Sequence, residues 1–122
     1  DNEPLPGVLA FRVQSSLLYF NTDHVLDLVR RRARAESGLQ RVICDLSNTP
    51  YVDVAGARML RRLDEELRAD NVDFKIVEAH GPVRDVLRAE RLEETVGAIS
   101  RHSGLADLVN STSRETGGPE TR

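Results

Sequence analysis

The sequence is poor in several features whose scarcity excludes whole classes of protein. It has a single cysteine, Cys44, so it cannot form an internal disulfide and gives no sign of an oxidising compartment. No apolar run reaches the roughly 20 residues that a bilayer-spanning helix needs. No secretory signal stands at its start, and the only methionine is Met59. We therefore expect a disulfide-free domain cut from a longer product.

Positive charge is also limited. The chain carries 17 basic and 20 acidic residues, a net charge of −3, and Lys75 is the only lysine. No basic stripe with interleaved aromatic residues occurs, although such a stripe is the footprint of phosphate-backbone binding. The sequence therefore predicts that nucleic acid is not a partner.

Motifs for cofactors and catalysis are missing as well. The sequence has no G-x-x-x-x-G-K, no G-x-G-x-x-G and no serine-nucleophile elbow. The three histidines, His24, His80 and His102, are far apart and have no cysteine or aspartate at metal-ligand spacing. Cys44 lies among apolar residues, which indicates a buried structural thiol. We therefore expect no metal, no required cofactor and no enzymatic activity.

What the sequence does contain is an alternation of strand and helix patterns. We predict strands at 8–14, 15–21, 41–46, 72–78 and, at an edge, 96–99. The first two are so close that they predict an antiparallel hairpin. Helices are predicted at 23–36 and 54–70, after Gly81 and after Ser103. Asn21 or Thr22 caps the first helix, and Gly38 follows its end.

This order predicts one α/β domain. At 122 residues the chain has the size of a single domain. Its pattern indicates a central mixed or mostly parallel sheet of four to five strands with about four helices packed on it. The continuous apolar run at 41–46 predicts a strand buried on both faces. Residues 1–7 read as a linker, 8–110 as the domain and 111–122 as a disordered polar tail.

The candidate site lies in the stretch VICDLSNTPYVDVAG, residues 42–56, which runs from a strand into a helix. Polar residues at the carboxyl ends of parallel strands are where ligands and partners usually bind in open α/β sheets. Asp53 also stands where a helix cap accepts backbone N–H groups. An Asp45–Asp53 acid–base pair would lack a further base or oxyanion donor. The candidate binding loop comprises Asp45, Ser47, Asn48, Thr49, Tyr51, Asp53, Val54, Ala55 and Gly56.

The same stretch resembles the STAS domain, which SulP-type anion transporters share with bacterial anti-sigma factor antagonists. The family pattern is an apolar strand ending in D-L/M-S, followed by D-S/T-S/T-G at a helix start. Asp45, Leu46 and Ser47 match the first part, and Asp53 and Gly56 match the second. The segment GVLAFRVQSSLLYFNTDHV is similar to the transporter branch, whose domain begins after the membrane helices. The resemblance covers residues 6–110 and implies a STAS-like fold.

One departure from the family pattern changes the expected mechanism. In the antagonists, the second hydroxyl residue of D-S-S-G is phosphorylated, and the equivalent position here is Ala55, preceded by Val54. Neither side chain can accept a phosphate. The resemblance therefore implies a docking loop that lacks the phosphorylation switch of the antagonists.

The leading hypothesis is a non-catalytic regulatory domain on the cytoplasmic side of the cell membrane, within a transporter for sulfate, bicarbonate or chloride. Its partners would be the membrane domain of the same polypeptide, a second copy or a soluble protein. One alternative is a stand-alone protein similar to the antagonists. Another is a guanine-nucleotide sensor, because the helix start at Val54 can approach a phosphate, although Asp53 brings a negative charge to the same place.

Overall fold

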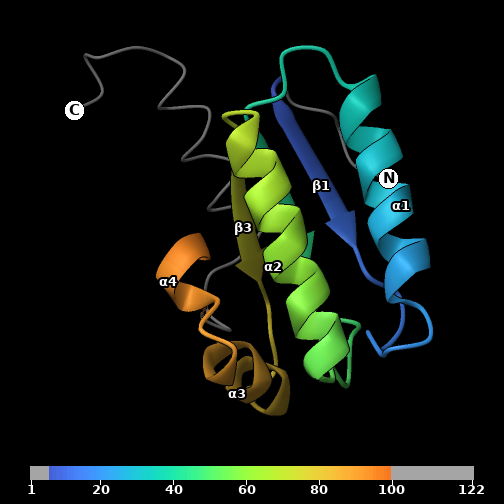
Figure 1. Ribbon diagram of the computed structural model, residues 1–122, viewed down its shortest axis with the longest axis vertical. Coiled ribbons are helices and arrows are strands. Elements are labelled where there is room, and N and C mark those ends of the chain that lie inside the picture. The colour runs from blue at the N-terminus through green and yellow to red at the C-terminus, as the bar shows by residue number, and fades with distance from the viewer. Residues whose placement is uncertain (1–5, 100–122) are drawn as a thin grey trace.

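The computed structural model describes residues 6–99, which form three strands and four helices. The strands are β1 (Val8–Arg12), β2 (Arg41–Asp45) and β3 (Asp73–Val77). The helices are α1 (Thr22–Ala35), α2 (Val54–Ala69), α3 (Gly81–Ala89) and α4 (Glu93–Val96). Strands and long helices alternate along the chain, so the predicted α/β class is confirmed (Figure 1).

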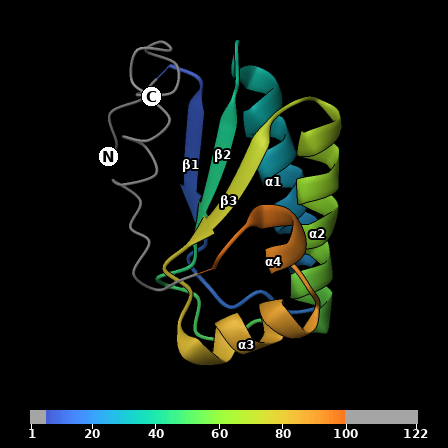
Figure 2. The same cartoon turned by 90° about the vertical axis from the view of Figure 1, so that its left-hand side faces the viewer.

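The three strands form a parallel sheet in the order β1-β2-β3. Because both crossovers step in the same direction, α1 and α2 cover the same face of the sheet (Figure 2). Toward these helices the sheet presents two rows of apolar side chains that the register aligns: Leu9, Val42 and Phe74, then Phe11, Cys44 and Ile76. The core therefore lies between the sheet and the α1–α2 layer.

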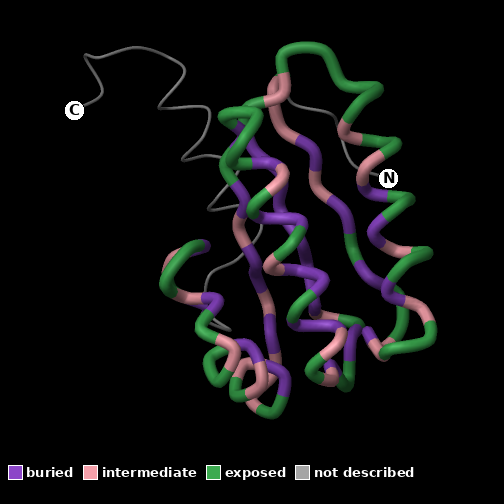
Figure 3. The backbone as a smooth tube through the Cα atoms, viewed as in Figure 1, coloured by how far each residue is buried: buried purple, intermediate pink, exposed green. Residues whose placement is uncertain are grey.

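The amphipathic pattern of the long helices explains this packing. Leu60, Leu63 and Leu67 of α2 recur every three or four residues and are all buried. Figure 3 shows buried and exposed positions recurring along the long helices. On the outer side, Arg30 of α1 donates two hydrogen bonds to the Glu66 carboxylate of α2. The Arg30 guanidinium lowers the pKa of Glu66, so this carboxylate stays ionised and links the two helices.

The central strand is buried on both faces, as its apolar run predicts. All five residues of β2 are buried, including Arg41 and Asp45 at its two ends. Arg41 forms an ion pair with Asp73 of β3 at 2.8 Å, so its buried charge has a partner. Cys44 is fully buried, and burial raises the pKa of its thiol, as does the neighbouring Asp45. The prediction of an inert structural thiol fits this position.

Two predicted strands are wrong. Residues 15–21 do not form a hairpin with β1; only Leu17 makes a bridge, and it is parallel and pairs with Val52. The Asn21 side chain closes this segment into a turn by accepting from the Leu18 N–H, so the backbone cannot continue as a strand. Within the described residues the sheet thus has three strands instead of four to five, and every pairing is parallel.

The predicted edge strand at 96–99 is also wrong. Val96 ends the short helix α4, and Gly97 follows with a φ of +88°. Two apolar residues there, Val96 and Ile99, are buried without strand pairing. The predicted helix after Ser103 and the polar tail at 111–122 lie outside the described residues, and the domain boundaries at 7/8 and 110/111 stay predictions.

Candidate functional site

The candidate loop begins at a buried carboxylate, Asp45, at the carboxyl end of β2. Its Oδ2 accepts from Nε of Arg12 at 3.1 Å, and its Oδ1 accepts from the Ser47 N–H at 2.8 Å. Burial alone would raise the pKa of Asp45, but the hydrogen bonds from Ser47 and Arg12 outweigh it and lower the pKa. Asp45 is therefore an ionised structural anchor at neutral pH and a poor general acid.

The next residues fasten the loop to its neighbours on both sides. Asn48 donates to the Gln14 side chain at 2.9 Å, and the fully buried Thr49 donates to the Val13 carbonyl at 3.3 Å. On the other side, Nε2 of His80 lies 2.9 Å from the Ser47 carbonyl oxygen. The polar residues of the loop thus satisfy backbone and side-chain partners of the fold, which leaves few of them free for a ligand.

Asp53 holds two segments together. Its Oδ1 accepts from the Gly56 N–H at 2.8 Å, which confirms the predicted cap of α2. Its Oδ2 accepts from the Tyr19 N–H at 2.9 Å, a contact with the loop between β1 and α1 that the sequence did not reveal. The Asp53 N–H donates to the Leu17 carbonyl at 3.1 Å. Asp53 is therefore both the helix cap and the fastening point of the loop that precedes α1.

Gly56 is required by the same contact. A Cβ added at Gly56 would lie 2.5 Å from the Leu17 carbonyl oxygen, closer than real Cβ atoms come to backbone. It would also lie 3.0 Å from the Leu17 Cβ and from the Val52 Cγ1. The atoms nearest to a Cβ at Gly56 thus belong to the segment before α1 and to the loop before α2.

The two loops that the hydrogen bonds of Asp53 join carry apolar side chains that face solvent. We call the set the apolar corner; it consists of Tyr19, Phe20, Tyr51 and Val54, with exposed fractions of 76%, 69%, 67% and 46%. The Tyr19 and Phe20 rings make an edge-to-face contact, with their centroids 5.5 Å apart. Tyr51 and Val54 belong to the predicted loop, whereas Tyr19 and Phe20 were missed as site residues. The scarcity of aromatic residues, 4% of the chain, was the signal that could have found them.

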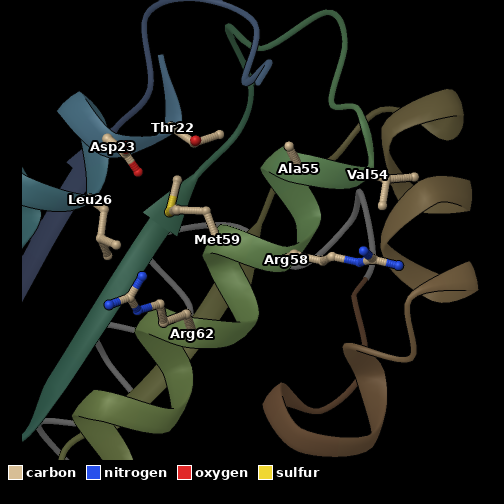
Figure 4. A pocket seen from close by; sticks show the side chains of 8 residues that line it. All are labelled: Thr22, Asp23, Leu26, Val54, Ala55, Arg58, Met59 and Arg62. Carbon is tan, nitrogen blue, oxygen red and sulfur yellow. The ribbon is translucent and has the colours of Figure 1, made fainter. Parts of the chain in front are cut away.

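A groove of about 490 Å³ continues from the corner between the starts of α1 and α2 (Figure 4). Its lining consists of Thr22, Asp23, Leu26, Val54, Ala55, Arg58, Met59 and Arg62. In Figure 4 the Arg62 side chain extends toward α1. Ala55, the position equivalent to the antagonist phosphosite, presents only a methyl group to this groove. The structure therefore brings Val54 and Ala55 to the groove, whereas Asp45 is held in the ion pair with Arg12.

Residues 6–99 contain no cluster of three or more histidine, cysteine, aspartate or glutamate side chains that could hold a metal ion. Among the helices of this part of the chain, none is long and apolar enough to cross a membrane.

The chain combines an α/β fold with the D-L-S motif at the end of β2 and the Asp53–Gly56 motif at the start of α2. This combination defines a class of domain, which comparison with known families identifies. The model of the STAS domain family matches residues 1–106. The chain therefore belongs to the STAS domain family, as its sequence motifs indicated.

Relatives of the chain are much longer proteins. It is 27% identical over 126 residues to "High affinity sulfate transporter 1" of Stylosanthes hamata, a match that covers 96% of this chain and 18% of the relative. It is 26% identical over 117 residues to "Sulfate transporter 2.2" of Arabidopsis thaliana, covering 85% of this chain and 17% of that protein. The chain thus spans less than a fifth of the length of these relatives.

Solved structures show the same fold. The murine anion transporter Solute Carrier 26 family member A9 matches with a TM-score of 0.77 and 18% identity, over 91% of this chain and 18% of that one. A sulfate transporter family protein from Wolinella succinogenes matches with a TM-score of 0.75 and 15% identity, over 97% and 93%. The SulP transporter STAS domain from Vibrio cholerae matches with a TM-score of 0.74 and 12% identity, over 93% of this chain and 88% of that one. At these identities the likeness concerns the fold.

Proposed function

We propose that this chain is the cytoplasmic regulatory STAS domain of a SulP-type anion transporter and acts by docking, without catalysis. The observation that carries the proposal is the apolar corner, which the Asp53 carboxylate fastens at the junction of two loops. A cluster of exposed apolar side chains of this kind marks an interaction site in soluble domains. The relatives are sulfate transporters about five times longer than this chain, which supports a membrane domain as the docking partner.

The chemistry of the site supports the non-catalytic part of the proposal. Asp45 is buried in an ion pair and Asp53 is occupied by two backbone N–H groups, so neither carboxylate is placed to move a substrate proton. Ala55 cannot be phosphorylated, which argues against the stand-alone antagonist-like alternative. We propose sulfate, bicarbonate or chloride as the cargo of the membrane domain, with homodimer assembly or a soluble protein as further ways in which the domain could act.

The reading frame upstream of the chain provides the first test. We expect it to encode several apolar spans of about 20 residues. A frame without them would refute the transporter proposal. If they are present, anion uptake into vesicles should be compared between the complete transporter, a version lacking this domain and the Phe20→Ser/Tyr51→Ser double variant. Docking through the corner predicts reduced uptake in both altered proteins at equal amounts in the membrane.

A guanine nucleotide is a second candidate ligand, because the groove beside Ala55 is of ligand size and Arg58 and Arg62 line it. The carboxylate of Asp53 already takes the Gly56 N–H at the start of α2, which works against a phosphate there. Amide NMR titration with GDP and ATP, with and without magnesium, decides this point. Shifts confined to residues 54–62 would support a nucleotide site, and no shifts at millimolar nucleotide would refute it.

A further inference from the structure

The apolar corner concentrates a residue type that the chain otherwise uses sparingly. The chain has two tyrosines and three phenylalanines, and three of these five aromatic residues are exposed at the corner. The other two, Phe11 and Phe74, are buried in the core. Single exposed apolar residues are ordinary on protein surfaces, but three of five aromatic side chains on two adjoining loops are not.

The loops that carry the corner are uncharged. Residues 14–22 and 46–52 contain no acidic or basic side chain, although 30% of the chain is charged. Depletion of charge around aromatic side chains is the composition found in the centre of protein interfaces. The corner therefore has the composition of an interface centre.

Hydrogen bonds fix the backbone beneath the aromatic side chains. Asn21 accepts from the Leu18 N–H at 3.0 Å and donates to the Ser16 carbonyl at 2.8 Å. The Ser16 hydroxyl accepts from the Tyr51 N–H at 3.2 Å, and Asp53 accepts from the Tyr19 N–H at 2.9 Å. Because the loops are held before any partner arrives, little conformational entropy is lost when the corner binds.

The charge next to the corner is negative. Within residues 6–99, neither Asp23 nor Asp53 forms a direct ion pair, although the Arg30 charge acts on Asp23 at longer range. The other arginines nearby are paired with glutamates. Arg58 contacts Glu90 at 3.2 Å and Arg62 contacts Glu66 at 3.3 Å. The exposed Asp23 carboxylate beside these aromatic rings suits a guanidinium group, which pairs with carboxylates and stacks on aromatic faces. Both oxygens of Asp53 already accept backbone N–H groups, so Asp53 adds only its charge.

We propose that the apolar corner binds an arginine-bearing segment on the cytoplasmic side of the transporter's own membrane domain. Cytoplasmic loops of membrane proteins carry an excess of lysine and arginine, which complements the acidic residues beside the apolar corner and the net charge of −3. The inference rests on the proposed function for the origin of the segment. The chemistry of the corner itself selects the arginine.

The test uses the 122-residue chain and three matched 12-residue peptides in which leucines alternate with arginine, lysine or glutamate. Amide NMR titration is expected to show shifts confined to residues 17–24 and 50–56. Binding should be tightest for the arginine peptide, at least fivefold weaker for lysine and absent for glutamate. Equal binding of the glutamate peptide, or shifts spread over the whole acidic surface, would overturn the proposal.

Matched variants separate the corner from general charge attraction. Phe20→Ser and Asp23→Asn should each weaken the arginine peptide at least fivefold. Asp70→Asn makes the same charge change on an exposed residue at the far end of α2 and should leave binding unchanged. Equal effects of Asp23→Asn and Asp70→Asn would refute a specific site, as would corner shifts caused by phosphatidylcholine vesicles and by none of the peptides.

The two proposals fail in different ways. An upstream reading frame without membrane spans would refute the transporter but would leave the peptide result standing. If the upstream reading frame does encode membrane spans but the arginine peptide does not bind, only the proposed arginine site is refuted.

Discussion

The two long helices begin differently, although a short polar residue precedes each. Asp53, before α2, gives one carboxylate oxygen to the N–H of its own helix. Asn21, before α1, makes no side-chain hydrogen bond to its helix and uses its amide group within the preceding turn. A polar side chain before a helix thus serves whichever backbone groups would otherwise lack a partner. The residue that joins the loop before α1 to a helix start is therefore the cap of α2, Asp53, and not the residue before α1.

The largest effect is expected at Gly56, where the α2 start touches the segment before α1. Gly56→Ala places a Cβ 2.5 Å from the Leu17 carbonyl oxygen, so α2 or the segment must move. We expect a loss of about 3 kcal/mol in the free energy of unfolding, at the upper end for overpacking. Gly81→Ala is the matched control, because its nearest neighbour atom would be 3.9 Å away. Urea unfolding measures both, and similar stabilities would contradict the close approach.

The next largest effect is expected from Asp53→Ala. The change removes a helix cap, which contributes about 1 kcal/mol, and the bond to the Tyr19 N–H, which adds about 1 kcal/mol. We expect a total loss of about 2 kcal/mol, together with faster hydrogen exchange at the Tyr19 amide. A loss of only about 1 kcal/mol with unchanged exchange at Tyr19 would show that Asp53 acts on its own helix alone.

A smaller and differently placed effect is expected from Asn21→Ala. It removes two hydrogen bonds of the partly exposed turn, for a loss of about 1 kcal/mol. Because Asn21 does not cap α1, the helix content measured by circular dichroism should stay the same while the Leu18 amide exchanges faster. Fraying of the first turn of α1, seen as faster exchange at the Val25 amide, which donates to the Asn21 carbonyl, would show that the two helix starts are alike after all.

The smallest effect at neutral pH is expected from Asp45→Asn, which retains one hydrogen-bond acceptor at the loop start. Because the pKa of Asp45 is lowered in the folded protein, its charge stabilises the fold above the unfolded value of about 3.9 and stops doing so as the pH falls through the folded value. Stability should therefore fall less steeply below about pH 4 in Asp45→Asn than in the wild type. Parallel urea-midpoint profiles from pH 7 to pH 3 would contradict this.

Local patterns were enough to predict the layers of the fold. The leucine spacing of α2, the continuous apolar run of β2 and the alternation in β3 each specify an element on their own. Asp53 was recognised as a cap for the same reason, because a cap needs only its own helix. The strand prediction for residues 15–21 was wrong because the hydrogen-bond partners of this backbone, Tyr51 and Asp53, lie more than 30 residues away in the sequence.

Only the part of the candidate site that lies on the β2–α2 loop was predicted, and the part between β1 and α1 was missed. Tyr19 and Phe20 belong to the apolar run of residues 17–20, which lies in the predicted strand at 15–21. Fastening by Asp53 and the turn closed by Asn21 turn both rings outward to solvent instead. No local pattern distinguishes these outcomes, since the deciding hydrogen bonds join segments that are distant in the sequence. Gly56 likewise needs the Leu17 carbonyl to explain it.

The burial of Cys44 has a practical consequence for studying this domain in a larger assembly. Its thiol is fully enclosed and has a raised pKa, so it reacts slowly with maleimides while the protein is folded. A second cysteine introduced at the exposed Asp70, away from the apolar corner, would therefore take a fluorophore or spin label alone, without removing Cys44. The wild-type background is already suited to distance measurements between this domain and whatever it binds.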